Sequence, residues 1–272
     1  MQNNPRLTDT NALRRNRARA DLTNGMFLHA AAIAEVQDRL SLVNRQFTAP
    51  AIVTGFPAVW SACLPKAMLI PDEEVLELQP QKHDLVVHGL GLHWADDPVG
   101  QIIQCRRALK DDGFCLFVTF GGRTLYELRA SLAQAEVEIT GGLSPRVAPM
   151  GEIRDLGALL QRAGLALPVA DTVPLKVTYE SPWALMKDLR AMGEGNALND
   201  RIQRPTRRSI LTRASEIYVK SFMKDGRIPA TFEMIFLTGW APDASQPKPL
   251  RPGSATNRLA DALSTSEFKL PK

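Results

Sequence analysis

Residues 84–122 constrain the fold more than any other part of the chain. They open with a short apolar run, residues 84–88, of the kind that forms a buried strand in a parallel sheet. A loop follows, then helical spacing of apolar residues over residues 99–110, and a second apolar run over residues 114–119. Strand, helix and strand with short connections form a βαβ unit, so the sequence predicts an α/β fold with a mostly parallel sheet.

Both ends of the predicted helix carry capping signals. Asp96 and Asp97 precede Pro98, which suits the first helical turn, so they are N-cap candidates first. Read as a carboxylate pair, they could instead serve acid–base chemistry. Gly113 follows the helix as a candidate left-handed C-cap. A valine at Gly113 is therefore expected to strain the backbone and destabilise the fold.

The carboxyl ends of these two strands are where a ligand should bind. In open parallel sheets, ligands lie beyond the strand ends, next to the loops that follow them. Here those loops carry His88, Gly89, His93 and Trp94 on one side and residues 120–122 on the other. The two histidines have no third ligand at a recognisable spacing, so no metal site is predicted.

A series of sequence words continues in order from Asp84 to Ala255. They are DLVVHGLGLHW, QCRRALKDDG, GGRTLYELR, GGLSPRV, RDLGALLQRAG, LMKDLRAMGEGN, DGRIPATFE and SQPKPLRPGSA. Together they resemble the class I S-adenosylmethionine (SAM) dependent methyltransferases. More narrowly, they are similar to the branch that holds the biotin-pathway malonyl-carrier methyltransferases and the complex I assembly factor that acts as an arginine hydroxylase. The words ALRRNRARA and VQDRLSLVNRQF match more loosely.

The resemblance implies a doubly wound, mostly parallel, Rossmann-like sheet. It places an N-terminal helical cap at residues 1–46 and the methyltransferase-like domain at residues 47–241, with a helical insertion at residues 182–224. Residues 242–272 are expected to form an extended surface tail, since they are rich in proline and polar residues. SAM is the implied cofactor.

The chain departs from the family where the cofactor would bind. The first strand, expected at residues 47–55, ends in Gly55-Phe56-Pro57 instead of a three-glycine turn, and Pro57 has no N–H to donate. Residues 55–84 leave room for about one βα unit, since such a unit takes roughly 30 residues. The family has two, so the sheet is predicted to be trimmed by one unit, with loss of the acidic residue that holds the ribose. Weak SAM binding or none is expected.

Asp72 is a candidate substitute for that acid, although a solvated turn is the alternative. Trp94 could line the pocket or pack on the next helix, and His88 stands where the family has a small residue. No catalytic residue can be named, and the predicted cofactor-binding residues are Gly55, Asp72, His88, Gly89, His93 and Trp94. Other charged residues in family words could bind a substrate guanidinium or carboxylate, or form exposed ion pairs: Glu127, Arg129, Arg146, Arg154 and Asp155.

The remaining elements follow from apolar spacing and caps. Helices are predicted at residues 7–19 with Asn11 as cap, at 27–44 and 59–64, and at 124–137 with a capping box of Thr124 and Glu127. Further helices are predicted at 153–163, ended by Gly164, and at 183–192 and 206–222. Strands are predicted at 67–70, 174–179 and 232–240, the last of them antiparallel.

Composition limits the function classes. The net charge of +4 is mild, and the arginines near the N-terminus and at Arg204, Arg207, Arg208 and Arg213 are not interleaved with aromatic residues. Nucleic-acid binding is therefore not expected, and these groups form solvated helix faces or contact an acidic protein partner. No apolar run is long enough for a membrane span, and the first residues lack a secretory pattern. Three cysteines without metal spacing fit buried apolar positions and a cytoplasmic protein.

Two functions remain open. One is enzymatic: a SAM-using transferase, or a hydroxylase that acts on arginine in a protein. Methyl transfer depends on positioning, so the lack of an evident base does not argue against it. The other is a non-catalytic binding or assembly-factor module that has kept the fold and holds a protein partner.

Overall fold

The computed structural model describes residues 6–247 and 263–265 of the 272. The chain divides into two compact units, residues 1–242 and 243–272, and the description below concerns the first. Most of the predicted tail lies outside the described residues. Among the residues that the structure describes, no helix is both long and apolar enough to cross a membrane.

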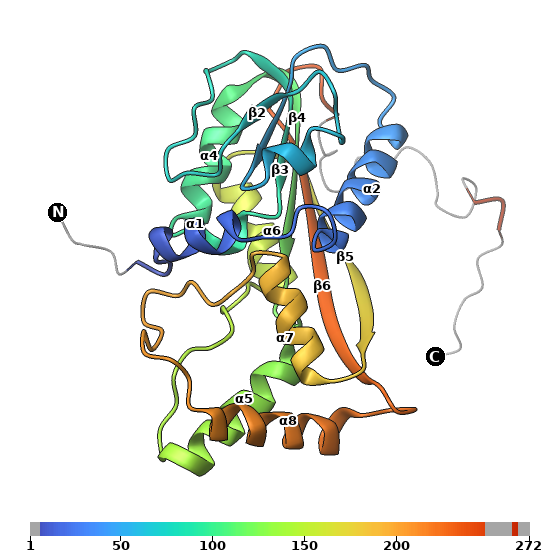
Figure 1. The fold of residues 1–272 in the computed structure, drawn as a ribbon. Coiled ribbons are helices and arrows are strands. Elements are labelled where there is room, and N and C mark those ends of the chain that lie inside the picture. Colours follow the sequence, from blue (N-terminus) through green and yellow to red (C-terminus); the bar gives the residue numbers. More distant parts are fainter. Residues whose placement is uncertain (1–5, 248–262, 266–272) are drawn as a thin grey trace, which may run out of the picture. The chain divides into compact units, whose positions relative to one another are not determined.

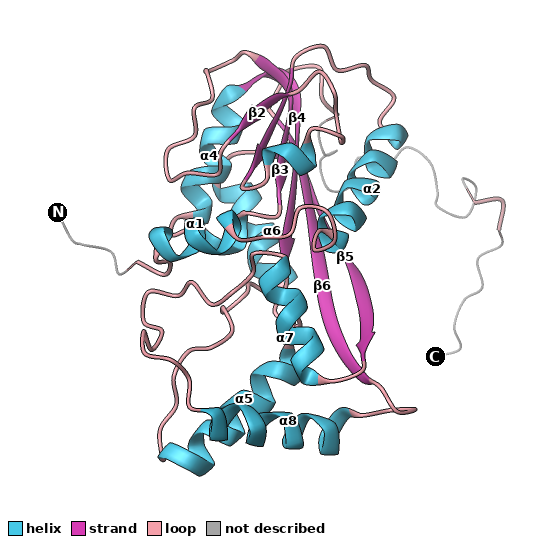
Figure 2. Cartoon of the chain, viewed as in Figure 1, coloured by secondary structure: helices cyan, strands magenta, loops and turns pink. Residues whose placement is uncertain are grey.

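A six-stranded sheet forms the centre of the larger unit (Figures 1 and 2). Its order is β2-β1-β3-β4-β6-β5. The first four strands are parallel to one another, and β6 is antiparallel to both of its neighbours, β4 and β5. The predicted α/β class, the mostly parallel sheet and the antiparallel last strand are confirmed. The strands are β1 (Pro50–Thr54), β2 (Met68–Ile70), β3 (His83–Gly89), β4 (Leu109–Phe120), β5 (Ala166–Tyr179) and β6 (Ile228–Trp240).

The trimmed half of the sheet is visible in this order. β2 pairs directly with β1, and only the short α3 (Pro57–Trp60) lies between them in sequence. Between β1 and β3 the chain forms α3 and β2, which is one helix and strand unit instead of two, as the spacing predicted. Asp72 therefore follows the strand next to β1, two residues beyond the pair Val53 and Ile70.

Helices cover both faces of the sheet. One apolar core lies between the sheet and α2 (Phe27–Leu42), α3 and α5 (Tyr126–Thr140), and extends to α7 (Pro182–Ala191) and α8 (Arg208–Phe222). The other lies under α4 (Pro98–Ala108) and α6 (Ile153–Arg162). α1 (Thr10–Ala18) and the single turn η1 (Leu92–Trp94) lie near the strand ends, and α7 and α8 lie within residues 182–224, the segment predicted to be a helical insertion and called the insertion below.

β3 shows why the sequence folds this way. All seven of its residues are buried, with Leu85 and Val87 in one core and Val86 in the other. A strand buried on both faces needs a continuous apolar run, which residues 84–88 supply. Cys63, Cys105 and Cys115 are buried and free, as expected.

The caps of α4 are as predicted only at its start. Asp97 is the N-cap and accepts a hydrogen bond from the Gly100 N–H at 2.8 Å, while Pro98 occupies the first turn. At the other end the chain passes from Ala108 straight into β4. The left-handed residue is Asp112, with φ of 56°, and Gly113 has no positive φ. Gly113 as C-cap was wrong; it is needed for space, because a Cβ there would lie 2.8 Å from the Lys110 carbonyl oxygen.

The predicted capping box of α5 and the predicted cap of α1 are both wrong, for different reasons. Thr124 does not cap α5, because its hydroxyl accepts from the Glu233 N–H at 3.0 Å in β6. Glu127 is buried and accepts from the Thr231 hydroxyl at 2.6 Å. Tertiary bonds to β6 have replaced the local capping box. At α1, Asp9 is the cap in place of Asn11, with its carboxylate 2.9 Å from the Ala12 N–H.

Gly164 ends α6 as predicted and offers a clean test of backbone strain. Its φ is +77°, and a Cβ there would meet nothing closer than 3.5 Å, so only the left-handed backbone opposes a side chain. We expect Gly164→Ala to lower the free energy of unfolding by about 1–2 kcal/mol. Gly157→Ala in the same helix is the control, because it should raise that energy by roughly 0.5–1 kcal/mol. Urea unfolding measures both, and equal effects would contradict the assignment.

Candidate functional site

The carboxyl ends of the parallel strands meet at one edge of the sheet. Gly55 follows β1, Asp72 follows β2 and Gly89 ends β3, while His93 and Trp94 lie in η1 just beyond. The topology thus brings these five predicted residues to one region. What occupies the space between them decides what the region can bind.

Arg17 of α1 fills the space beside β1. Its Nη1 and Nη2 lie 2.6 and 2.8 Å from the two carboxylate oxygens of Asp72. Both side chains are largely, though not fully, buried, with 13% and 7% of their surface exposed. The guanidinium lies directly on the backbone of Gly55, because a Cβ there would come within 2.2 Å of its carbon. Asp72 lies on Gly91 in the same way. A bidentate ion pair of the chain itself therefore holds this place.

Aromatic side chains fill the space beside β3. The Trp60 indole packs on Gly89, where a Cβ would lie 2.5 Å from its ring. Its Nε1 donates to Nδ1 of His29 at 2.9 Å, and Phe56 meets the His29 ring edge-on at 4.8 Å. Burial lowers the pKa of His29 to about 4, so the ring is neutral near pH 7 and its nitrogen can accept.

These residues do not fit a bound SAM molecule. The cavity that remains between Arg17, Asp72, Gly91 and Trp94 has a volume of about 70 Å³. Pockets for small-molecule ligands are usually about 300–1,000 Å³. The positions that would have to meet a cofactor, Gly55 and Asp72, are already in contact with Arg17.

His88 lies away from this edge, in the packing between the sheet and α4. Its Nε2 lies 2.8 Å from Oε1 of Gln101, and its ring stacks on Phe117. Burial lowers the pKa of His88, so it is a neutral core residue. Its side chain thus packs toward α4, although the charge of Asp72 is near enough to influence its pKa.

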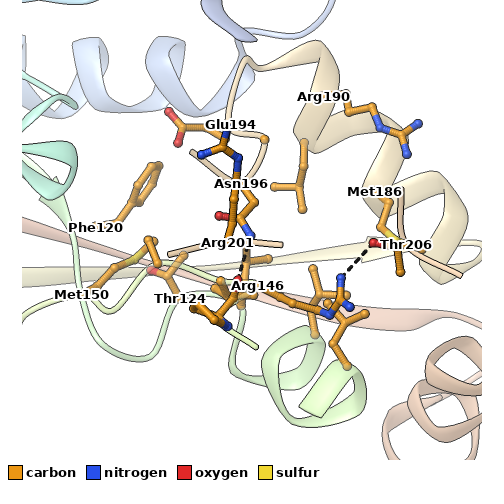
Figure 3. Close-up of a pocket in the computed structure, with 18 of the residues that line it drawn as sticks. Phe120, Thr124, Arg146, Met150, Met186, Arg190, Glu194, Asn196, Arg201 and Thr206 are labelled. Atoms are coloured by element: carbon orange, nitrogen blue, oxygen red, sulfur yellow. Dashed lines mark hydrogen bonds between the residues drawn. The ribbon is translucent and has the colours of Figure 1, made fainter. Parts of the chain in front are cut away.

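A larger cavity opens on the insertion side of the strand ends. Its volume is about 360 Å³, and it lies among β4, β6, α2, α5, α7, α8 and the loops before α6 and after α7 (Figure 3). Of the predicted cofactor-binding residues, Trp94 lines it. The apolar part of the wall includes Leu28, Phe120, Leu128, Met186, Leu189 and Phe232.

Glu194 is the acidic residue on this wall. Its Oε2 accepts from Trp94 Nε1 at 2.9 Å and lies 3.3 Å from His93 Nε2. Burial alone would raise the pKa of Glu194, but the charges of His93 and Arg17 and the bonds from His93 and Trp94 lower it to about 2. The second oxygen, Oε1, has no hydrogen-bond partner within the described ranges. A negative charge therefore lies at the wall of the cavity.

The local chain explains how Glu194 reaches this position. Gly193 follows α7 with φ of +78°, which turns the chain inward at a point where a side chain would meet Phe56. Glu194 was not among the predicted site residues, because its partner His93 lies 101 residues away in the sequence. The motif LMKDLRAMGEGN contains Glu194 and was the sequence signal that could have identified it.

Three arginines also line the cavity, and two of them are neutralised. Arg146 pairs with Glu136 at 2.6 Å and donates to Thr206 at 2.9 Å, as Figure 3 shows for Thr206. Arg201 pairs with Asp9 at 2.8 Å. Arg190 is exposed and forms no ion pair in the described structure.

The other charged candidates have different positions. Arg129 donates to the carbonyl of Thr124 at 3.3 Å and, at 3.5 Å, to that of Gly122, so it closes the start of α5. Arg154 and Asp155 are exposed on α6. Of the five charged candidates Glu127, Arg129, Arg146, Arg154 and Asp155, Arg146 therefore lines the cavity and the other four do not.

Comparison with known proteins gives several relatives. No family model matches the chain. The mitochondrial arginine-hydroxylase NDUFAF5 of Homo sapiens is 39% identical over 194 residues, 71% of this chain and 56% of that protein. The Dictyostelium discoideum protein of the same name is 39% identical over 199 residues, 72% of this chain and 45% of that protein.

Methyltransferases are also among the relatives. A malonyl-[acyl-carrier protein] O-methyltransferase from Methylovorus sp. (strain MP688) is 34% identical over 204 residues, 75% of this chain and 62% of that protein. The chain thus spans less than two-thirds of each of these relatives. Of solved structures, phosphoethanolamine N-methyltransferase 2 of Haemonchus contortus superposes with a TM-score of 0.43 at 11% identity, over 77% of this chain and 53% of that one.

The lowered pKa of Glu194 predicts an acid-sensitive fold. A carboxylate with a lowered folded pKa stabilises the protein fully above its unfolded pKa of 4.5 and loses this effect as the pH falls toward 2. Between about pH 5 and pH 2, we expect wild type to lose up to about 3 kcal/mol more unfolding free energy than Glu194→Gln. Urea unfolding over this range measures the difference.

The matched control is Glu180→Gln, because Glu180 is exposed and forms no ion pair in the described part of the chain. Its acid profile should follow wild type. Parallel profiles for Glu194→Gln and wild type would show that Glu194 is not held as a buried anion.

Proposed function

We propose that this chain is a member of the class I methyltransferase family and that it binds a protein partner without depending on SAM. By resemblance the family's cofactor is SAM, and the positions for it are Gly55, Asp72, His88, Gly89, His93 and Trp94. The observation that carries the proposal is the ion pair of Arg17 and Asp72, which lies on Gly55 where the cofactor would bind.

The energy of that ion pair sets the expected cost of cofactor binding. For SAM to enter, Arg17 would have to leave Asp72 and expose or bury its charge elsewhere. Separating the partners of a buried, hydrogen-bonded pair costs about 3–5 kcal/mol. A cost of this size weakens a dissociation constant by a factor of about 10² or more. Weak SAM binding or none follows.

The cavity suits a cationic side chain of the partner. Glu194 is the acidic residue on a wall whose arginines Arg146 and Arg201 are already paired with other carboxylates, and a carboxylate pairs best with a guanidinium, which can donate several hydrogen bonds. The relatives named arginine-hydroxylase act, by that name, on arginine. We therefore assign the cavity to an arginine of a protein partner, with its aliphatic stem along Leu28 and Phe120.

Methyl transfer is the second candidate, favoured by the similarity to the malonyl-carrier O-methyltransferases. It would require Arg17 to move out of the strand edge. Glu194, with a pKa of about 2, is too weak a base to deprotonate an acceptor at neutral pH.

The compartment of the protein is inferred from its cysteines. The three free, buried cysteines fit the reducing cytoplasm.

Calorimetric titration with SAM tests the first part of the proposal. Wild type should give no heat or a dissociation constant above about 100 μM, and Arg17→Ala should bind at least about tenfold more tightly, because the variant vacates the space on Gly55. Arg15→Ala is the matched control on α1, since Arg15 is exposed and forms no ion pair in the described residues. It should behave as wild type. A low-micromolar constant for wild type would overturn the proposal and favour methyl transfer; circular dichroism would verify that each variant is folded.

The arginine assignment has its own readout, the NMR signal of the Trp94 indole N–H that donates to Glu194. N-acetylarginine amide should shift this signal, while the citrulline analogue, which has the same shape without the charge, should not. Glu194→Gln should remove the response to arginine. Equal shifts with both compounds, or an unchanged response in Glu194→Gln, would reject Glu194 as the anchor.

A further inference from the structure

A groove on the outside of the insertion is separate from the cavity. It runs between α7 and α8, has a volume of about 690 Å³, and is lined by Trp183, Thr206, Arg208, Leu211, Thr212, Ser215, Glu216 and Val219. Thr206 and Leu211 also line the cavity that holds Glu194. The start of α8 therefore separates the two spaces, and one partner could contact both.

The floor of the groove is apolar. Trp183, in the first turn of α7, has 45% of its surface exposed, whereas Trp60 and Trp94 are buried. Leu211 and Val219 are half-buried beside it. An exposed tryptophan in a concave, apolar setting is typical of the centre of a protein interface.

Free basic residues lie at and just before the start of α8. Arg208 lines the groove, and Arg204 and Arg207 precede it in the chain; all three are exposed, and none forms an ion pair in the described structure. The arginine further along α8 differs, because Arg213 pairs with Glu138 at 2.6 Å and with Glu216 at 3.0 Å. The free positive charge is thus concentrated at the N-terminal end of α8.

This placement is unfavourable for the helix alone. The N-terminus of α8 has no side-chain cap and no acidic residue in its first turn. The positive end of the helix dipole then lies beside Arg207 and Arg208, which repel it. Carboxylates from outside would neutralise both the arginines and the unpaired N–H groups.

We propose that the α7/α8 groove docks an acidic, amphipathic segment of a partner protein. Its apolar side chains cover Trp183 and Leu211, and its carboxylates pair with Arg204, Arg207 and Arg208. The inference rests on the proposed function, in which a partner inserts an arginine into the neighbouring cavity. The groove indicates that the partner segment beside this arginine is acidic. The net negative charge of that segment complements the net positive charge of the insertion.

The test uses a fluorescein-labelled synthetic helical peptide with leucines on one face and glutamates on the other. Fluorescence anisotropy with the full chain measures its binding, and a peptide with glutamines in place of the glutamates is compared. We expect the glutamate peptide to bind at least about tenfold more tightly, and the difference to shrink as salt is raised past physiological strength.

Charge reversal locates the site. The triple variant R204E/R207E/R208E should weaken the glutamate peptide by about tenfold or more, and Trp183→Ala should weaken both peptides. The matched control R107E/R154E/R162E changes the net charge equally at exposed arginines of α4 and α6, on the other face of the sheet. It should change binding by less than about twofold.

Three results would overturn the proposal. They are no measurable binding of the glutamate peptide, equal weakening by the two triple variants, and a concentration-dependent dimer in light scattering that Trp183→Ala abolishes, since a second copy would then cover the groove. Failure here is distinguishable from failure of the proposed function. The SAM titration and the Trp94 signal report on the strand edge and the cavity, and neither involves the three reversed arginines.

Discussion

The ion pair between Arg17 and Asp72 determines what the strand edge can bind. It joins α1 to the chain after β2, and it lies on two glycines, Gly55 and Gly91, where no side chain could fit beside it. Because both groups are buried, neither can lose its partner without leaving an uncompensated charge. The pair therefore keeps α1 against the edge, and the space that remains open is the cavity on the insertion side.

α1 also carries this constraint to the insertion. The Asp9 N–H donates to the Ala197 carbonyl at 2.8 Å, and the Asn16 amide donates to the Gly195 carbonyl at 3.0 Å. These bonds hold the loop after α7, which contains Glu194, against the strand ends. The same arrangement brings Arg17 near enough to help lower the pKa of Glu194. The helix that fills the cofactor edge is thus the one that positions the anion in the cavity.

The sequence predicted the elements better than their ends. Apolar spacing was sufficient for β3, α4 and β6. Thr124 was misassigned because its hydroxyl bonds to Glu233, distant in sequence, and Gly113 was misassigned because the chain passes from α4 straight into β4 without a left-handed glycine. The site was only partly predictable. Gly55, Asp72, His93 and Trp94 do gather at one edge, but Arg17 was interpreted as part of a solvated basic helix. Its partner is 55 residues away, so no local pattern could reveal that one arginine of several is buried.

The missing βα unit gives a physical reason for this pairing. β2 lies directly beside β1 with Val53 opposite Ile70, and this register brings Asp72 level with Gly55. In a sheet with an intervening strand, the two would stand about 10 Å apart, since neighbouring strands are about 4.8 Å apart. A carboxylate placed this close to the end of β1 and covered by α1 needs a cation, and Arg17 supplies it. The trimmed sheet therefore brings Asp72 beside the end of β1, and Arg17 neutralises this carboxylate from within the chain.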